Sequence, residues 1–318
     1  MHNIKKWLDQ TPYKNYELSI ASADASFREY YRLSDGDKTV LLMDSSLEKE
    51  SLAPFIDITS RLLDAGAKAP KILEKNEEDG FLIIEDFGNV HYLNVLDAEN
   101  FKELYSNAMD EIIKMQKADI SNLPIYDKDF LLFEMGLMQE WYLEKKLAID
   151  LNAEQKELIS DSLNLIADVV LSQPQNVFVH RDFHSRNIMI TPQKTIGIID
   201  YQDAMSGAIT YDLVSLLKDC YIEYKRSDVE ELVLNFRDKI GSDAGDEEFI
   251  KWFDFMGLQR HIKVLGVFSR LYLRDGKDGY LKDIPLTLKY VLETASRYDE
   301  TKDLAELLKE FTSWKRWF

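Results

Sequence analysis

The sequence predicts an α+β fold in two lobes, with a small β-rich lobe first and a larger helical lobe after it. Residues 1–90 contain mostly short runs rich in β-branched and aromatic residues. From about residue 97, apolar residues recur at the spacing of amphipathic helices. The length of 318 residues also exceeds what one hydrophobic core usually fills. We therefore predict an N-terminal lobe of residues 1–90 and a C-terminal lobe of residues 91–318.

The predicted N-terminal lobe contains five strands and one helix. The helix covers about Glu50–Ala65, where apolar residues follow a helical period, and Gly66 is a suitable C-terminal stop. It lies between the third and fourth strands. The five predicted strands are Leu18–Ser22, Tyr30–Leu33, Thr39–Met43, Lys71–Glu74 and Phe81–Ile84.

The predicted C-terminal lobe is a series of helices with one interruption. Apolar stripes predict helices over 101–115, Lys128–Lys146, 158–170, Leu213–Leu217, Trp252–Leu273 and Leu286–Leu292. The interruption, residues 176–203, has two short apolar runs around a turn at Thr191–Lys194, which predicts a β-hairpin.

Composition excludes several classes of protein. The net charge of −18 argues against a nucleic-acid-binding surface, because phosphate backbones require clustered Lys and Arg. No segment approaches the roughly 18 uninterrupted apolar residues of a membrane span. The lone cysteine, Cys220, permits no intramolecular disulfide and fits a reducing compartment. We expect a cytoplasmic monomer that binds neither nucleic acid nor membrane.

The hairpin brings three polar side chains to one end. If Ile190 pairs with Gly197, antiparallel register places Asn187 opposite Asp200. Asp182 lies five residues before Asn187, in the loop that leads to the same end. Taken singly, these residues also suit a turn, a helix cap and the end of a strand.

The stretch His180-Arg181-Asp182-Phe183-His184-Ser185-Arg186-Asn187 matches the kinase catalytic loop H-R-D-x-x-x-x-N. Phosphoryl transfer needs a carboxylate at the acceptor hydroxyl and oxygen ligands that hold Mg²⁺ against the phosphates of ATP. We predict Asp182 as the catalytic base and Asn187 and Asp200 as ligands of Mg²⁺. His180 is expected to be a buried structural residue, and His184 either orients the loop or contacts substrate.

Two upstream segments are candidates for nucleotide binding. The first, 22–28, joins two predicted strands and carries small residues that would let backbone N–H groups approach phosphates. The second, 81–88, is an apolar strand that runs into a polar turn and can present backbone groups to an adenine edge. The nucleotide-binding candidates are Ser26, Phe27, Arg28, Arg32, Glu85, Asp86 and Phe87.

The acceptor pocket is predicted around the same end of the hairpin. Glu134 lies inside an apolar stripe, where an unpartnered carboxylate is costly, and Glu140 falls near the same face. Binding the acceptor explains Glu134; an internal salt bridge with Arg181 or Arg186 is the alternative. The remaining candidates for acceptor contacts are Arg181, His184, Gln202, Asp203 and Tyr211.

With these pieces in order, the chain resembles the aminoglycoside phosphotransferase and choline kinase superfamily. The segments SADASFREYYRL, FLIIEDFG, HRDFHSRN and IIDYQDAMSGAITYDLVSLLKDCY are similar to those of the bacterial N-acetylmuramate/N-acetylglucosamine kinases of cell-wall recycling. The resemblance implies a bilobal protein-kinase-like fold with a small antiparallel sheet. It also implies ATP as co-substrate, Mg²⁺, and an amino sugar phosphorylated at its anomeric hydroxyl.

Two features depart from the kinase pattern. The third strand, Val40–Asp44, lacks the lysine that such kinases direct at the α- and β-phosphates; Arg28, Arg32 or Lys49 could replace it. The usual D-F-G is Asp200-Tyr201-Gln202. Two other functions stay open. The acidic net charge would suit the cationic acceptors of an aminoglycoside or choline-type kinase, and the missing strand lysine would suit a nucleotide-binding module without catalysis.

Overall fold

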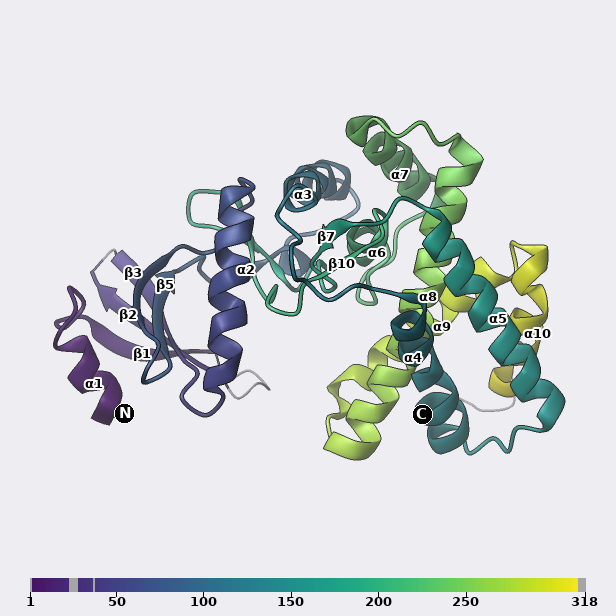
Figure 1. Cartoon of the computed structure of the whole chain (residues 1–318), viewed down its shortest axis with the longest axis horizontal. Coiled ribbons are helices and arrows are strands. Elements are labelled where there is room, and N and C mark those ends of the chain that lie inside the picture. Colours follow the sequence, from purple (N-terminus) through teal and green to yellow (C-terminus); the bar gives the residue numbers. More distant parts are fainter. Residues whose placement is uncertain (1, 23–27, 37, 314–318) are drawn as a thin grey trace.

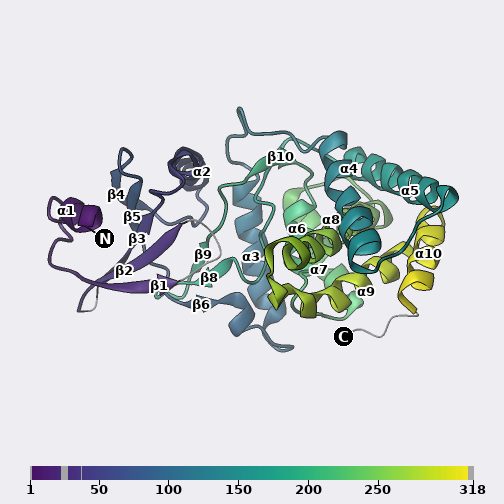
Figure 2. The same cartoon turned by 90° about the horizontal axis from the view of Figure 1, so that it is seen from below.

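The computed structural model describes residues 2–313, except for residues 23–27 and 37. An antiparallel sheet with two helices forms one end of the molecule and a larger group of helices forms the other (Figure 1). Short strands lie between these two parts in a second view (Figure 2). The predicted two-lobed α+β fold is confirmed. The division between residues 90 and 91 stays a prediction, and strand β6 (Val90–His91) spans it.

The N-terminal lobe is built on a five-stranded sheet with the order β1-β2-β3-β5-β4, in which all neighbours are antiparallel. All five strands lie within two residues of the predicted bounds: β1 (Glu17–Ser22), β2 (Glu29–Asp35), β3 (Lys38–Asp44), β4 (Ile72–Asn76) and β5 (Phe81–Glu85). The predicted helix consists of a 3₁₀ turn (Lys49–Ser51) and α2 (Leu52–Asp64). It ends where predicted, with Gly66 in the left-handed conformation at φ 78°.

A helix covers each face of this sheet. Leu42 of β3 packs with α1 (His2–Leu8), whose Trp7 ring stacks on Phe81 at 5.7 Å. The next residue, Met43, points to the opposite face and joins the core that contains α2, because side chains alternate along a strand. Helix α1 was not predicted from the sequence.

Three short strands connect the lobes through the order β6-β8-β9, with β8 (Ile188–Ile190) and β9 (Ile196–Ile198) forming the predicted hairpin. The predicted register is wrong by one residue, because Met189 pairs with Gly197 and Ile190 pairs with Ile196. Thr191 and Thr195 are still bonded across the strands, with Thr191 N donating to Thr195 O at 2.8 Å. The loop therefore has three residues and not the four that were predicted.

The C-terminal lobe contains the predicted helices with two additions, α7 and α10. Its helices are α3 (Phe101–Met115), α4 (Lys128–Leu137), α5 (Ala153–Ser172), α6 (Tyr211–Leu217), α7 (Arg226–Ile240), α8 (Asp246–Asp275), α9 (Ile284–Ala295) and α10 (Lys302–Ser313). Short 3₁₀ segments occur at Tyr92–Asn94, Asp278–Asp283 and Asp299–Thr301, and β7 (Val177–Val179) pairs with β10 (Met205–Gly207). Within the described part of the chain, every helix is too short or too polar to cross a membrane.

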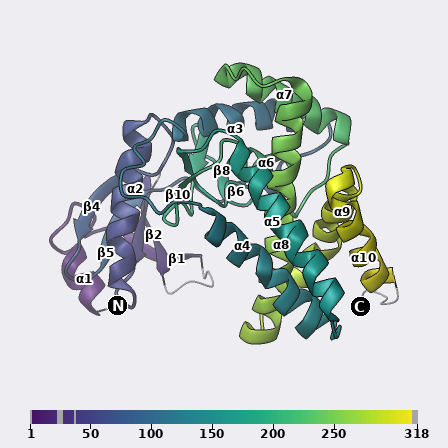
Figure 3. The same cartoon turned by 45° about the vertical axis from the view of Figure 1, so that its right-hand side comes forward.

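Helix α8 is the centre of this lobe and packs against α4 and α5 (Figure 3). The backbone of α8 at Gly266 comes very close to the end of α4. A Cβ atom at Gly266 would lie 2.3 Å from the carbonyl carbon of Leu137. Beyond Leu137 the predicted single helix continues as a π-helix, Met138–Lys146. The close crossing brings the interior side chains of α4 and α8 together, which positions one wall of the site described next.

Candidate active site

The described structure brings Asp182, Asn187 and Asp200 together. Asn187 Nδ2 donates to Asp200 Oδ2 at 3.2 Å and to the Asp182 carbonyl oxygen at 3.0 Å. Asn187 is opposite Ile199, not Asp200, but Asp200 has a left-handed backbone at φ 65°, which directs the chain out of the strand. Gln202 Nε2 donates to the other oxygen of Asp200 at 2.9 Å. The predicted proximity therefore holds although the predicted register does not.

Two buried acids on and after α6 hold the loop that carries Asp182. Asp212 accepts hydrogen bonds from the backbone N–H groups of His180 and Arg181, at 2.8 and 3.1 Å. Asp219 accepts from the Ser185 hydroxyl at 2.5 Å. Burial raises the pKa of both acids, although these hydrogen bonds oppose the change. The sequence analysis did not single out either acid, because both lie more than 30 residues from the groups that they bind.

The ring of His180 has the structural role predicted for it. It is almost fully buried, and its Nε2 lies 3.0 Å from the Ile199 carbonyl oxygen. His184 is half-buried, and its backbone N–H donates to the Asp182 carbonyl at 3.0 Å. Burial lowers the pKa of His184 to about 3, so its imidazole is neutral at neutral pH. This backbone contact does not involve the imidazole, so both predicted roles of His184, orienting the loop and contacting substrate, stay predictions.

Asp182 is the accessible member of the loop, with 47% of its side chain exposed. Arg260 of α8 lies 3.6 Å from its carboxylate and also donates to the Arg181 carbonyl at 2.7 Å. Desolvation would raise the pKa of Asp182, but the charges of Arg260 and Lys263 outweigh it and hold that pKa well below its ordinary value. The carboxylate is therefore ionised at neutral pH, and it is suited to orient a hydroxyl group and accept its proton.

The second wall of the site is a buried charged network centred on Glu134 of α4. Its carboxylate pairs with Arg181 at 2.8 Å and with Lys263 at 3.1 Å. The Tyr126 hydroxyl donates to it, and so does Gln259 at 3.3 Å. The structure thus contains the salt bridge that was the alternative for Glu134. Acceptor binding by Glu134 stays a prediction. If Glu134 contacts the acceptor, it does so together with the two cations that pair with it.

The other predicted acceptor residues lie at different distances from this network. Tyr211 belongs to it, because its buried hydroxyl accepts from Lys263 at 3.1 Å. Asp203 contacts Arg181 through its carbonyl oxygen at 3.4 Å. Glu140 is separate: its half-exposed carboxylate pairs with Lys145 on the π-helix. The role of Glu140 in acceptor binding stays a prediction that none of its contacts supports.

The structure describes five of the seven residues that were predicted to bind the nucleotide. Ser26 and Phe27 lie outside the described residues. Arg28 donates to the Ser51 hydroxyl and carbonyl, each at 3.3 Å, at the start of α2. Lys49 donates to the Glu78 carbonyl at 2.6 Å. The structure therefore leaves the replacement for the strand lysine a prediction.

Arg32 connects β2 to the turn that follows β5. It binds the Asp86 carboxylate through two hydrogen bonds, at 2.6 and 3.0 Å, and also the side chain of Asn89. Burial opposes ionisation of Asp86, but Arg32 and a backbone N–H group lower its pKa. Glu85 accepts from Lys71 N at 3.4 Å, and the buried Phe87 ring occupies the space above Gly197 of β9. The predicted adenine hinge is thus a braced turn between the lobes.

The residues at the hairpin end suit Mg²⁺. Among residues 2–22, 28–36 and 38–313, no three His, Cys, Asp or Glu side chains form a group that could hold a metal ion by themselves. Mg²⁺, however, is commonly bound by one or two protein oxygens together with substrate phosphates and water. Asp200 and the amide of Asn187 are oxygen donors of this kind at the exposed end of the loop. The set fits a metal that is completed by a nucleotide.

Sequence analysis missed the cations of α8, Arg260 and Lys263. Both are at least nine-tenths buried and face Asp182 and Glu134. A signal was present, since the otherwise apolar run around His261 contains charges three residues apart. The partners lie more than 70 residues away, so the sequence could not show which acids these cations meet.

Fold and site together define a small-molecule kinase. The chain belongs to the phosphotransferase enzyme family, whose model matches residues 17–247. It is 39% identical to an N-acetylmuramate/N-acetylglucosamine kinase of Neisseria meningitidis, over 96% of this chain and 94% of the relative. A protein of the same name from Pseudomonas aeruginosa is 38% identical, over 92% of this chain and 88% of the relative. The crystal structure of ADP-bound aminoglycoside phosphotransferase APH(2'')-Ib matches with a TM-score of 0.59 at 14% identity, covering 92% of this chain and 98% of that one.

Proposed function

We propose that this kinase transfers the γ-phosphoryl group of ATP to the anomeric hydroxyl of N-acetylglucosamine or N-acetylmuramate, with Mg²⁺ bound at Asn187 and Asp200. The observation that carries the proposal is the meeting of Asp182, Asn187 and Asp200 at one end of the hairpin. The names of the two relatives support the acceptor class, since both align with nearly the whole chain. An enzyme that uses ATP in this way is expected in the cytoplasm.

In this mechanism Asp182 orients the acceptor hydroxyl and receives its proton. The anomeric oxygen forms a bond to the γ-phosphorus while the bond between that phosphorus and the β–γ bridging oxygen breaks, and ADP leaves. Bound Mg²⁺ would neutralise charge on the phosphates. Asp212 and Asp219 keep the loop in place, so that Asp182 needs little rearrangement before it reacts.

The charges of the acceptor wall favour an uncharged or anionic acceptor. Three cations, Arg181, Arg260 and Lys263, surround the carboxylates of Glu134 and Asp182. Arg181 keeps 20% of its side chain exposed, which allows it to meet the lactyl carboxylate of N-acetylmuramate. A cationic aminoglycoside or choline-like acceptor would instead be repelled by these groups.

The test is an acceptor screen with the wild-type chain, ATP and Mg²⁺, in which ³¹P NMR detects sugar 1-phosphate. We expect product with at least one of the two amino sugars and a faster rate than with kanamycin or choline. A faster rate with a cationic acceptor would replace the proposed substrate class while keeping the kinase. Binding of Mg-ATP without turnover of any acceptor would indicate the nucleotide-binding module.

A further inference from the structure

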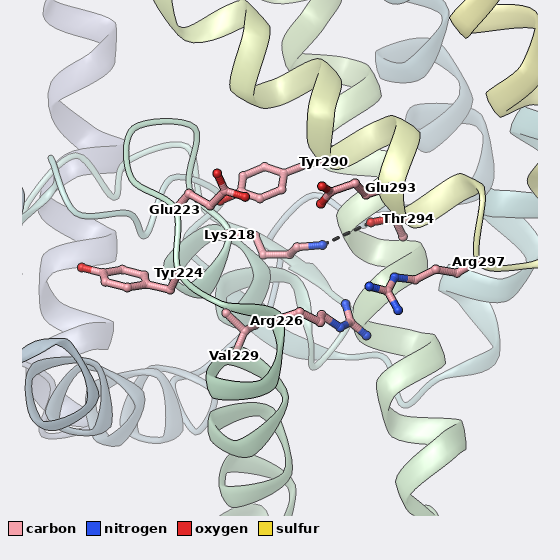
Figure 4. Close-up of a pocket in the computed structure, with 9 residues that line it drawn as sticks. All are labelled: Lys218, Glu223, Tyr224, Arg226, Val229, Tyr290, Glu293, Thr294 and Arg297. Atoms are coloured by element: carbon pink, nitrogen blue, oxygen red, sulfur yellow. Dashed lines mark hydrogen bonds between the residues drawn. The ribbon is translucent and has the colours of Figure 1, made fainter. Parts of the chain in front are cut away.

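A small cavity in the C-terminal lobe lies apart from the residues assigned to catalysis. It has a volume of about 50 Å³ and lies between α9, the start of α7 and the segment that follows α6. Figure 4 shows the side chains that line it: Lys218, Glu223, Tyr224, Arg226, Val229, Tyr290, Glu293, Thr294 and Arg297. Three cations therefore share a space that could hold only a few water molecules, each of which needs roughly 10–15 Å³.

Lys218 is the buried cation of this cavity. Only 7% of the residue is exposed, and its ammonium donates to the Thr294 hydroxyl at 3.1 Å. Its nearest aromatic ring is that of Tyr290, 5.1 Å from the ammonium nitrogen. No Asp or Glu of the described chain lies within 4 Å of this nitrogen. An ammonium in such a position has hydrogen-bonding capacity left for an anion.

The other charges of the cavity leave Lys218 and Arg297 as its two cations without an ion pair in the described chain. Arg226 is already paired, with both oxygens of Asp254 and with Glu230. The acids Glu223 and Glu293 face Lys289, at 2.6 and 3.8 Å. Arg297 has no ion pair with any acid in the part of the chain that the structure describes. Figure 4 shows its guanidinium and that of Arg226 pointing toward each other beside the Lys218 ammonium.

Burial is the main reason that the pKa of Lys218 falls to about 8; the charges of Asp254 and Glu293 oppose this fall, and those of Arg226 and Arg297 add to it. The ammonium group is therefore still mostly protonated at pH 7. A buried, mostly charged ammonium is favourable only with compensation, and the acids that act on Lys218, Asp254 and Glu293, do so without direct contact.

We propose that this cavity is a binding site for a small tetrahedral oxyanion of the phosphate class, held by Lys218 and Arg297 with Arg226 behind them. The cavity is too small for a nucleotide or a sugar phosphate, because pockets for such ligands enclose roughly 300 Å³ or more. Free phosphate offers four acceptor oxygens to the ammonium and guanidinium donors. The proposal is independent of the acceptor of the kinase.

The site adjoins the support of the catalytic loop. Asp219, which holds Ser185, follows Lys218 directly in the chain. The Lys218 carbonyl oxygen lies 2.8 Å from His261 Nε2, on the same helix as Arg260 and Lys263. A bound oxyanion would therefore join α7 and α9 behind the loop without entering the active site.

Calorimetric titration with inorganic phosphate tests the proposal. The protein is first saturated with Mg-ADP, so that phosphate cannot occupy the nucleotide site, and ionic strength is held constant with chloride. We expect wild-type protein to bind one phosphate, and Lys218→Met and Arg297→Gln each to weaken binding by about tenfold or more, since each removes charge-assisted hydrogen bonds. Arg274→Gln, at the exposed end of α8, is the matched control and should bind as wild type does.

A melting experiment separates a binding role from a structural one. Phosphate should raise the melting temperature of wild-type protein and of Arg274→Gln, and leave that of the two cavity variants nearly unchanged. Arg297 is exposed, so its variant should fold even if Lys218→Met does not. Unchanged phosphate affinity in Arg297→Gln, or loss of all phosphate binding once Mg-ADP is present, would overturn the proposal.

Discussion

The two walls of the active site are built in different ways. The catalytic wall comes from one segment, residues 180–203, which backbone hydrogen bonds and two buried acids hold in place. The acceptor wall joins α4, α8 and the loop residue Arg181 through ion pairs at Glu134. Asp200 is bonded to the amides of Asn187 and Gln202, whereas Glu134 is matched by two cations.

This difference shows which wall should govern which step. A carboxylate whose partners are amides keeps its negative charge available for a metal ion and phosphates. A carboxylate matched by cations acts mainly through the positions of those cations. We therefore expect substitutions in the catalytic wall to lower kcat, and substitutions in the acceptor wall to change KM and acceptor preference.

The largest effect is expected from Asp200→Asn, which removes the anionic metal ligand and keeps the shape of the side chain. We predict that kcat falls by roughly 10³-fold, because charge stabilisation by a metal contributes several kcal/mol to phosphoryl transfer. The measurement is the initial rate over a range of Mg²⁺ concentrations. Asp203→Asn, three residues on, is the control. Equal losses in the two variants would show that the catalytic wall does not depend on Asp200 as a metal ligand.

A smaller effect is expected from Asp212→Asn, which weakens the support of the catalytic loop. One amide oxygen can still accept, but the amide nitrogen would face a backbone N–H group that now lacks an acceptor. We predict a loss of about 1–3 kcal/mol in the free energy of unfolding, with a lower kcat and little change in the KM for the acceptor. Urea unfolding and steady-state kinetics check this, with the exposed Asp161→Asn as control. A change confined to the KM for the acceptor would contradict it.

Arg181→Gln tests the acceptor wall. It removes one partner of Glu134 but leaves Lys263, so the chain should remain folded. We predict that KM for N-acetylmuramate rises by about tenfold, the value of one charge-assisted contact, while KM for N-acetylglucosamine changes much less. Arg186→Gln, on the same loop, is the control. A similar rise for both sugars would show that Arg181 does not contact the lactyl carboxylate.

The smallest effect concerns pH, through the buried His261 of α8. Burial lowers its pKa to about 3, so between about pH 6.5 and 3 the unfolded chain binds a proton that the folded chain does not. The free energy of unfolding should therefore decrease as the pH falls below 6.5, by about 1.4 kcal/mol per pH unit from this residue. Urea unfolding at pH 7 and 5.5 should show a smaller decrease in His261→Gln. Equal decreases would place the pKa of His261 in its ordinary range.

The contrast between the walls also explains what the sequence could predict. Asp182, Asn187 and Asp200 belong to one segment, so a motif and a hairpin were enough to bring them together. The predicted register was wrong by one residue, because the run Thr191–Lys194 does not determine whether the turn has three or four residues. Glu134 was recognised as unusual from its place in an apolar stripe, but the choice of Arg181 and Lys263 as partners depends on how α4 crosses α8. That crossing requires the close contact at Gly266, which leaves no local signal in the sequence.

The most direct test of the catalytic account is Asp182→Asn, measured by ADP release and by nucleotide titration on the same protein preparation. We predict that turnover falls by about 10²–10⁴-fold, the usual contribution of a general base, while the dissociation constant for Mg-ATP stays within about threefold, because Asp182 faces the acceptor. Turnover near the wild-type rate would contradict the account, since the carboxylate at the centre of the site would then take no part in the reaction.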